Sequence, residues 1–282
     1  MKPPAHTHTH AMRQRGFTLV EAIMVMVITG VLAGIMVLFI RQPVRNYLDA
    51  ADRAELGDQA DLALRRMARE LRGALPNSVR QTVVNGVGLI EFIPTKIGGR
   101  YLSSEDGVVA PQQVLDFTTG ATAFTVDGAM PVGVTAIVKD DFIVVGNFGV
   151  GFDGADAYAG SNLARVSTVN DNLVTLVANP FKLSNQSPSQ RFQVVQQPVM
   201  FVCDPAASTL TRYWNYGFQA LIPAAGAGMS AVLARNVVSC AFQYGEQPNV
   251  HTGLIGLTIV LGRPNSDERI TLVHQIHVDN TP

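Results

Sequence analysis

The pattern of hydrophobic and polar positions divides the chain into three parts. Residues 17–40 are apolar except for one acid, Glu21. As a helix this segment would be about 36 Å long, enough to cross a hydrocarbon core of ~30 Å. Residues 47–75 become amphipathic, and the rest is rich in Val, Ile, Phe, Thr and Gly. The pattern therefore predicts a transmembrane helix, its amphipathic continuation and a β-rich domain.

The amphipathic segment is predicted to bury one face and to expose the other. Its apolar residues recur at helical spacing: Leu56, Ala60, Ala63, Leu64, Met67, Leu71 and Leu75. Asp61–Arg65 and Arg66–Glu70 are opposite-charge pairs at i, i+4 spacing. Stop signals at Gly73, Pro76 and Asn77 end the helix, and any bend is expected at Pro43.

The remaining sequence predicts an α+β fold, in which a β-rich head packs against the second half of the long helix. Residues 217–231 are predicted to form a loop. The predicted strands are residues 87–93, 135–146 (as one or two strands), 191–204, 209–214, 236–245, 253–262 and 269–279.

The charge distribution predicts the orientation of the apolar segment. Arg13 and Arg15 precede it, so its N-terminus is expected in the cytoplasm and the head in the periplasm. A secretory signal peptide fits poorly, because the apolar run is long and no small-x-small cleavage site follows it. The net charge of −1 becomes more negative without residues 1–16, which argues against nucleic acid as a partner. The arginines at 65, 66, 69 and 72 alternate with acids and predict a solvated or subunit-facing helix side.

The stretch "RGFTLVEAIMVMVITGVLAGI" resembles the N-terminal signal of type IV pilins and type II secretion pseudopilins. The resemblance implies that prepilin peptidase cuts between Gly16 and Phe17 and that Phe17 is then N-methylated. It also implies four regions: a leader (1–16), an assembly helix (17–40), its amphipathic continuation (41–76) and a pilin-like head (77–282). Translation from either Met1 or Met12 would supply a leader.

The resemblance also explains the acid in the membrane segment. A carboxylate within a membrane costs roughly 2.5–3.5 kcal/mol and usually marks a functional residue. In a packed filament, Glu21 is expected to pair with the N-terminal amine of a neighbouring subunit. Two buried charges become less costly when they meet with good geometry, so the pair favours one axial register. Glu21 is therefore predicted to act in assembly.

Cys203 and Cys240 fit either a disulfide or two buried thiols. Export of the head favours the disulfide, which would contribute about 3–4 kcal/mol on the loop-entropy model.

Metal, cofactor and catalytic sites are not predicted. His274 and His277 would face opposite sides of a strand, and His6, His8 and His10 lie in the leader. The "GVGFDG" stretch lacks the βαβ unit of a dinucleotide site, and its Asp153 and neighbouring Asp156 lack the ligand series of a calcium loop, so calcium is a weak alternative. No nucleophile or carboxylate pair suggests an enzyme.

Several stretches outside the signal are similar to minor pilins of mannose-sensitive haemagglutinin (MSHA) pili, namely residues 69–80, the region from 201–205 to 212–216, and residues 274–282. The J-type pseudopilin of type II secretion is the alternative. Either family implies that the chain is located in the inner membrane. Its implied partners are prepilin peptidase, other pilins, an assembly platform and the assembly ATPase. A third interpretation is a tip adhesin with a ligand pocket near residues 213–216.

Overall fold

The computed structural model describes residues 16–226, 228–247, 252–263 and 268–281. They fall into two units that divide between Ala54 and Glu55. The first unit is the N-terminal part of α1 (Leu19–Arg72), which continues through Pro43 as helix. Among the described residues, α1 is the one helix long and apolar enough to cross a membrane.

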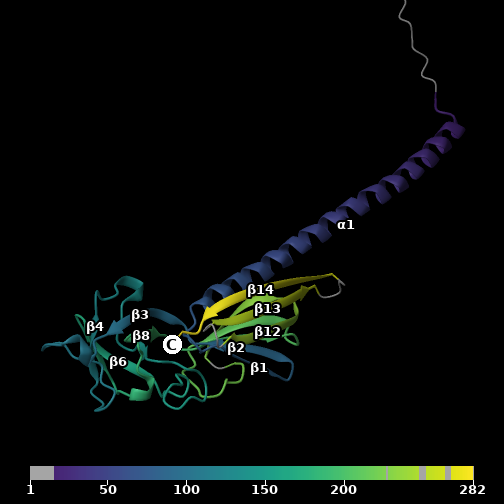
Figure 1. Cartoon of the computed structure of the whole chain (residues 1–282). Coiled ribbons are helices and arrows are strands. Elements are labelled where there is room, and N and C mark those ends of the chain that lie inside the picture. Colours follow the sequence, from purple (N-terminus) through teal and green to yellow (C-terminus); the bar gives the residue numbers. More distant parts are fainter. Residues whose placement is uncertain (1–15, 227, 248–251, 264–267, 282) are drawn as a thin grey trace, which may run out of the picture. The chain divides into compact units, whose positions relative to one another are not determined.

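The second unit contains the end of α1 and two antiparallel sheets (Figure 1). Within the described residues, one sheet has the order β1-β2-β9-β10-β11 and the other the order β12-β13-β14. The first comprises β1 (Arg80–Val84), β2 (Val87–Phe92), β9 (Val199–Asp204), β10 (Thr209–Trp214) and β11 (Met229–Arg235). The second comprises β12 (Val237–Gln247), β13 (Thr252–Gly262) and β14 (Arg269–Asp279).

The apolar face of α1 and both sheets share one core. The helical residues predicted to be buried between positions 56 and 71 are all buried, and they cluster with residues of β2, β9, β13 and β14. Met67 and Leu71 have no exposed surface, so truncating either to alanine would cost about 2–5 kcal/mol. The predicted ion pairs are present on the other face, at 2.6 Å for Asp61–Arg65 and 3.1 Å for Arg66–Glu70.

A closed β-barrel lies between β2 and β9 in the chain and has its own core. Figure 1 shows barrel strands β3, β4, β6 and β8 on one side of the second unit and β12–β14 on the other. The rings of Phe124 and Phe192 meet edge to face inside the barrel, 5.4 Å apart. In spatial order the strands are β3 (Thr95–Tyr101), β4 (Ala123–Asp127), β7 (Leu173–Leu176), β6 (Leu163–Asn170), β5 (Phe142–Val144) and β8 (Arg191–Val195).

Short 3₁₀ turns and a third apolar cluster complete the second unit. The turns are η1 (Ser104–Asp106), η2 (Gly133–Thr135) and η3 (Leu183–Asn185). The cluster joins residues after α1 and β2 to the barrel and includes Leu75, Ile93, Val144, Tyr158 and Val195. The barrel is therefore packed against the sheet core within this unit.

The α+β fold is confirmed, but three local predictions are wrong. Residues 135–146 contain only the short strand β5, because Asp140 adopts a left-handed conformation (φ 73°) and the Asp141 carboxylate accepts a hydrogen bond from the Val138 amide at 2.9 Å. The loop predicted for residues 217–231 ends earlier, because β11 begins at Met229 and pairs with β10. Residues 191–204 form two strands, β8 and β9, which belong to different sheets.

Candidate processing and assembly site

The start of α1 is organised around Thr18. Its side-chain oxygen accepts a hydrogen bond from the Glu21 amide at 3.3 Å, and its carbonyl accepts one from the Ala22 amide at 3.2 Å. A threonine in this position caps the first turn by satisfying an amide that has no partner within the helix. Gly16 and Phe17 precede the helix, and Phe17 is 81% exposed.

Glu21 lies in the first turn of α1, where its negative charge is favourable for the helix dipole. The spacing of Thr18 and Glu21 also matches a capping box, in which a glutamate or glutamine supports the cap. Its side chain is exposed in the isolated chain and stands among exposed apolar residues. The carboxylate is therefore accessible on the surface of α1.

The apolar surface that follows Glu21 is continuous and exposed. Ile23, Leu32, Met36 and Phe39 are each more than half exposed, and similar residues surround them. A soluble protein rarely exposes an apolar surface of this size, which marks a membrane or protein contact. A Cβ atom added at Gly30 or Gly34 would meet nothing within 4 Å, so these glycines leave room for a close neighbour.

These features fit a membrane-anchored protein whose N-terminal helix begins in a capped, acid-bearing segment. The family described as "Prokaryotic N-terminal methylation motif" matches residues 11–37. This match supports a type IV pilin or pseudopilin, a structural class that prepilin peptidase processes and that assembles with other pilins. No curated protein and no solved structure matches the chain.

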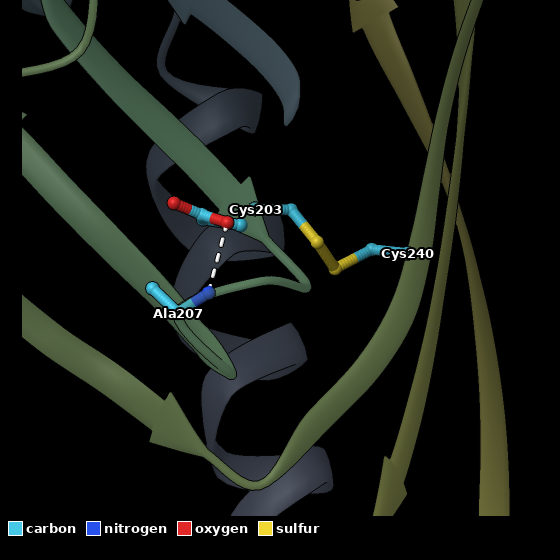
Figure 2. The surroundings of a disulfide bond; sticks show 4 residues. Cys203, Ala207 and Cys240 are labelled. Carbon is cyan, nitrogen blue, oxygen red and sulfur yellow. Dashed lines mark hydrogen bonds between the residues drawn. A yellow bond between two sulfur atoms is a disulfide. The ribbon is translucent and has the colours of Figure 1, made fainter. Parts of the chain in front are cut away.

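Cys203 and Cys240 form a disulfide in the structure. It joins β9 to β12 and so links the two sheets that share the α1 core, with the Cα atoms 6.3 Å apart (Figure 2). Next to it, the Asp204 carboxylate accepts a hydrogen bond from the Ala207 amide at 3.0 Å and closes the turn between β9 and β10. The predicted pair is therefore a cross-link between sheets.

Replacing both cysteines with alanine is expected to lower the free energy of unfolding by about 3–4 kcal/mol, because the unfolded chain gains the freedom of a long loop. Urea unfolding of the purified full chain measures this loss. The matched control is Ser239→Ala, an exposed neighbour on β12. A loss no larger than that of the control would contradict the stabilising role.

The histidines and aspartates that the sequence offered as metal ligands do not form a common site. His274 is partly buried and His277 is exposed on opposite faces of β14, as predicted. The Asp156 carboxylate accepts hydrogen bonds from three backbone amides, those of Gly151, Tyr158 and Ala159. Asp153 lies 3.6 Å from Lys182. Over the described ranges, no group of three or more His, Cys, Asp or Glu residues could hold a metal ion.

The sequence did not predict a buried polar cluster that involves Tyr216. Arg80 and Glu91 form an ion pair across the β1–β2 hairpin, and Glu91 has no exposed surface. The Tyr216 hydroxyl donates to Glu91 at 2.7 Å, and the Arg80 guanidinium lies 3.5 Å from the centre of the Tyr158 ring. Burial raises the pKa of Glu91, while the hydrogen bonds from Arg80 and Tyr216 act in the opposite direction.

This cluster holds the segment after β10 against the five-stranded sheet. The Arg80 guanidinium also donates to the carbonyl oxygens of Gln219 and Ala220, at 2.8 Å and 2.7 Å. One local signal could have revealed it. Asn85 and Gly86 both have positive φ, as in the tight hairpin turns that favour Asn-Gly, and such a turn places Arg80 opposite Glu91.

Glu91→Leu is expected to destabilise the protein by about 3–5 kcal/mol, because it leaves the Arg80 charge buried without its partner. The double variant Arg80→Met with Glu91→Leu is expected to recover at least half of that loss, since it removes both charges. Thermal unfolding of the full-length variants measures both effects, with the exposed Glu105→Leu as control. A double variant no more stable than Glu91→Leu would contradict this account.

Proposed function

We propose that this chain is a minor pilin of MSHA-type pili, most similar to the O-type subunit, and that it helps to initiate a filament at or near its tip. Prepilin peptidase cuts between Gly16 and Phe17 and methylates Phe17, and Glu21 then pairs with the N-terminal amine of a neighbouring subunit. The observation that carries the proposal is the methylation motif at the head of α1, with its single acid in the first turn.

The stretches on which the resemblance to this subunit rests meet at the end of α1, which supports the proposal. Glu70, from residues 69–80, lies 2.8 Å from Arg212, from residues 212–216. The side-chain oxygen of Asn280, near the C-terminus, accepts a hydrogen bond from the Asn77 amide at 3.2 Å. Similarity at positions that contact one another is more informative than the same similarity scattered over the chain.

The size of the head supports a tip position. The barrel between β2 and β9 adds a second hydrophobic core beside the core that packs on α1. A bulky head is tolerated where neighbours are absent on one side, whereas in a repeating shaft every subunit must accommodate it. We therefore propose that few copies are incorporated and that the assembly ATPase and the membrane platform act on this chain as they do on other pilins.

Deletion of the gene tests the proposal against the J-type pseudopilin of type II secretion. We expect the number of surface pili, counted by electron microscopy, to fall at least about tenfold while secretion of exoproteins continues. Complementation with the wild-type gene must restore the pili. Loss of secretion with normal pili would instead support the pseudopilin, and no change in either would contradict both assignments.

The proposal includes no catalytic residue and no bound cofactor. The head is proposed to act through the surfaces that it presents to other subunits and to the exterior.

A further inference from the structure

We propose that a cleft in the head, between the barrel and the five-stranded sheet, binds a neutral saccharide. The cleft has a volume of about 290 Å³. Three segments line it: the turn before β5, the connection from β8 to β9, and the end of β10. It thus lies where two hydrophobic cores adjoin, which is a common location for ligand sites.

The tyrosines near this position do not form the pocket. Tyr213 and Tyr216 pack against Leu89, Met200 and Val202, and Tyr216 is held by Glu91. The intervening Trp214, together with Arg212 and Asn215, lines the cleft instead. Side chains alternate across a strand, so the neighbours of Tyr213 on β10 face the other side of the sheet.

The charges in the cleft are already compensated by the protein. The described lining residues include three ionic side chains, and each has an opposite charge close by. Lys96 lies 2.7 Å from Asp141, Arg165 lies 2.9 Å from Asp140, and Glu70 lies 2.8 Å from Arg212. A phosphate or carboxylate ligand would have to compete for Arg212, and a cation would have to compete for the aspartates. The cleft therefore favours an uncharged ligand.

The amide side chains in the cleft suit hydroxyl groups. Gln196, Gln197 and Asn215 line it, and Gln196 and Asn215 are exposed. The Gln197 oxygen accepts a hydrogen bond from the Gly217 amide at 3.1 Å, which leaves its amino group to donate. A side-chain amide can donate and accept at once, and so can a hydroxyl group. Several amides around one cleft thus match a ligand with several hydroxyl groups.

Trp214 supplies the apolar part of the site. A sugar ring has faces of C–H groups as well as hydroxyl groups at its edge, and an indole offers a large, rigid apolar surface. The Arg212 guanidinium lies 4.9 Å from the centre of the Trp214 ring and is itself held by Glu70. These contacts orient the indole before a ligand arrives, which reduces the cost of binding. The volume is near the lower limit of ~300–1,000 Å³ for ligand pockets, which suits one or two sugar rings.

The experiment uses the fluorescence of Trp214, which is the only tryptophan in the chain. The full-length protein, in a detergent without a sugar headgroup, is titrated with glucose, galactose, N-acetylglucosamine, maltose, lactose and chitobiose. We expect at least one of them to change the emission saturably, whereas glycerol, a polyol without a ring, leaves it unchanged.

Variants then assign the effect to the cleft. Gln196→Ala and Asn215→Gly each remove one amide and are expected to weaken binding about 3- to 10-fold. Glycine keeps the left-handed turn that Asn215 adopts (φ 62°), so the backbone is not strained. The control is Gln112→Ala, an exposed glutamine outside the cleft.

Two results would overturn the proposal: no response to any of the six sugars by a folded protein, or a response that both amide variants leave unchanged. Either would leave the proposed role in pilus assembly untouched, because that role depends on α1 and not on this cleft.

Discussion

Gly16→Val is expected to accumulate as the uncut precursor. We expect the peptidase to hold Gly16 in a subsite that fits a glycine, where the valine side chain would not fit. Overfilling a tight site costs ~1–3 kcal/mol, which corresponds to cleavage about 5- to 150-fold slower. The fold should not change, because a Cβ atom at Gly16 would meet nothing within 4 Å. Intact mass of the membrane-extracted protein, with the peptidase present, distinguishes the precursor from a chain that begins at N-methyl-Phe17.

The matched control for this variant is Gly57→Val, a glycine later in α1 that also has free space around an added Cβ atom. It should be processed like the wild type. If the wild-type protein itself retains residues 1–16, the motif serves as a membrane anchor and the pilin pathway is excluded.

Glu21→Gln is expected to be cut and methylated normally but to enter filaments roughly 10²- to 4 × 10³-fold less. Removing one partner of a buried ion pair costs ~3–5 kcal/mol, because the remaining charge stays buried. Glutamine retains the shape of the side chain and is accepted in a capping box, so the cap formed by Thr18 should persist. The effect then reports on the charge of Glu21 and not on the stability of the first turn.

Sheared filament fractions, compared with the membrane fraction by immunoblot, measure this loss. The control is Glu55→Gln on the same helix, where the exposed carboxylate pairs with Arg263 of its own chain. Normal incorporation of the Glu21 variant would contradict the amine-pairing mechanism even if the Gly16 result confirms processing.

The long helix and the C-terminal strands could be predicted because their signals are local. The buried positions of α1 repeat every three or four residues, and β10, β13 and β14 were predicted to within one residue. Strand β14 alternates regularly, and this alternation alone predicts that His274 and His277 lie on opposite faces. Such segments carry their own pattern because one face of each lies against a core.

The barrel could not be predicted in the same way. Its six described strands each have eight residues or fewer: β3, β4, β6 and β7 were missed, β8 was merged with β9, and β5, which has only three residues, was predicted much too long. Strand β3 contains Gly98 and Gly99, which depress strand propensity, yet a side chain at Gly99 would overlap the Phe192 ring of β8. The reason for the glycine lies almost a hundred residues away in the chain.

The sequence by itself determined the processing motif, the acid in the first turn of the membrane helix and the stripe that packs against the head. These depend on residues within a few turns of one another. Only the tertiary structure decided the burial of Arg80 with Glu91, the closure of the barrel and the cleft around Trp214. Each of these arises from contacts between segments that are distant in the chain. The free energy of those contacts depends on which strands pair, and the hydrophobic pattern along the sequence does not specify that pairing.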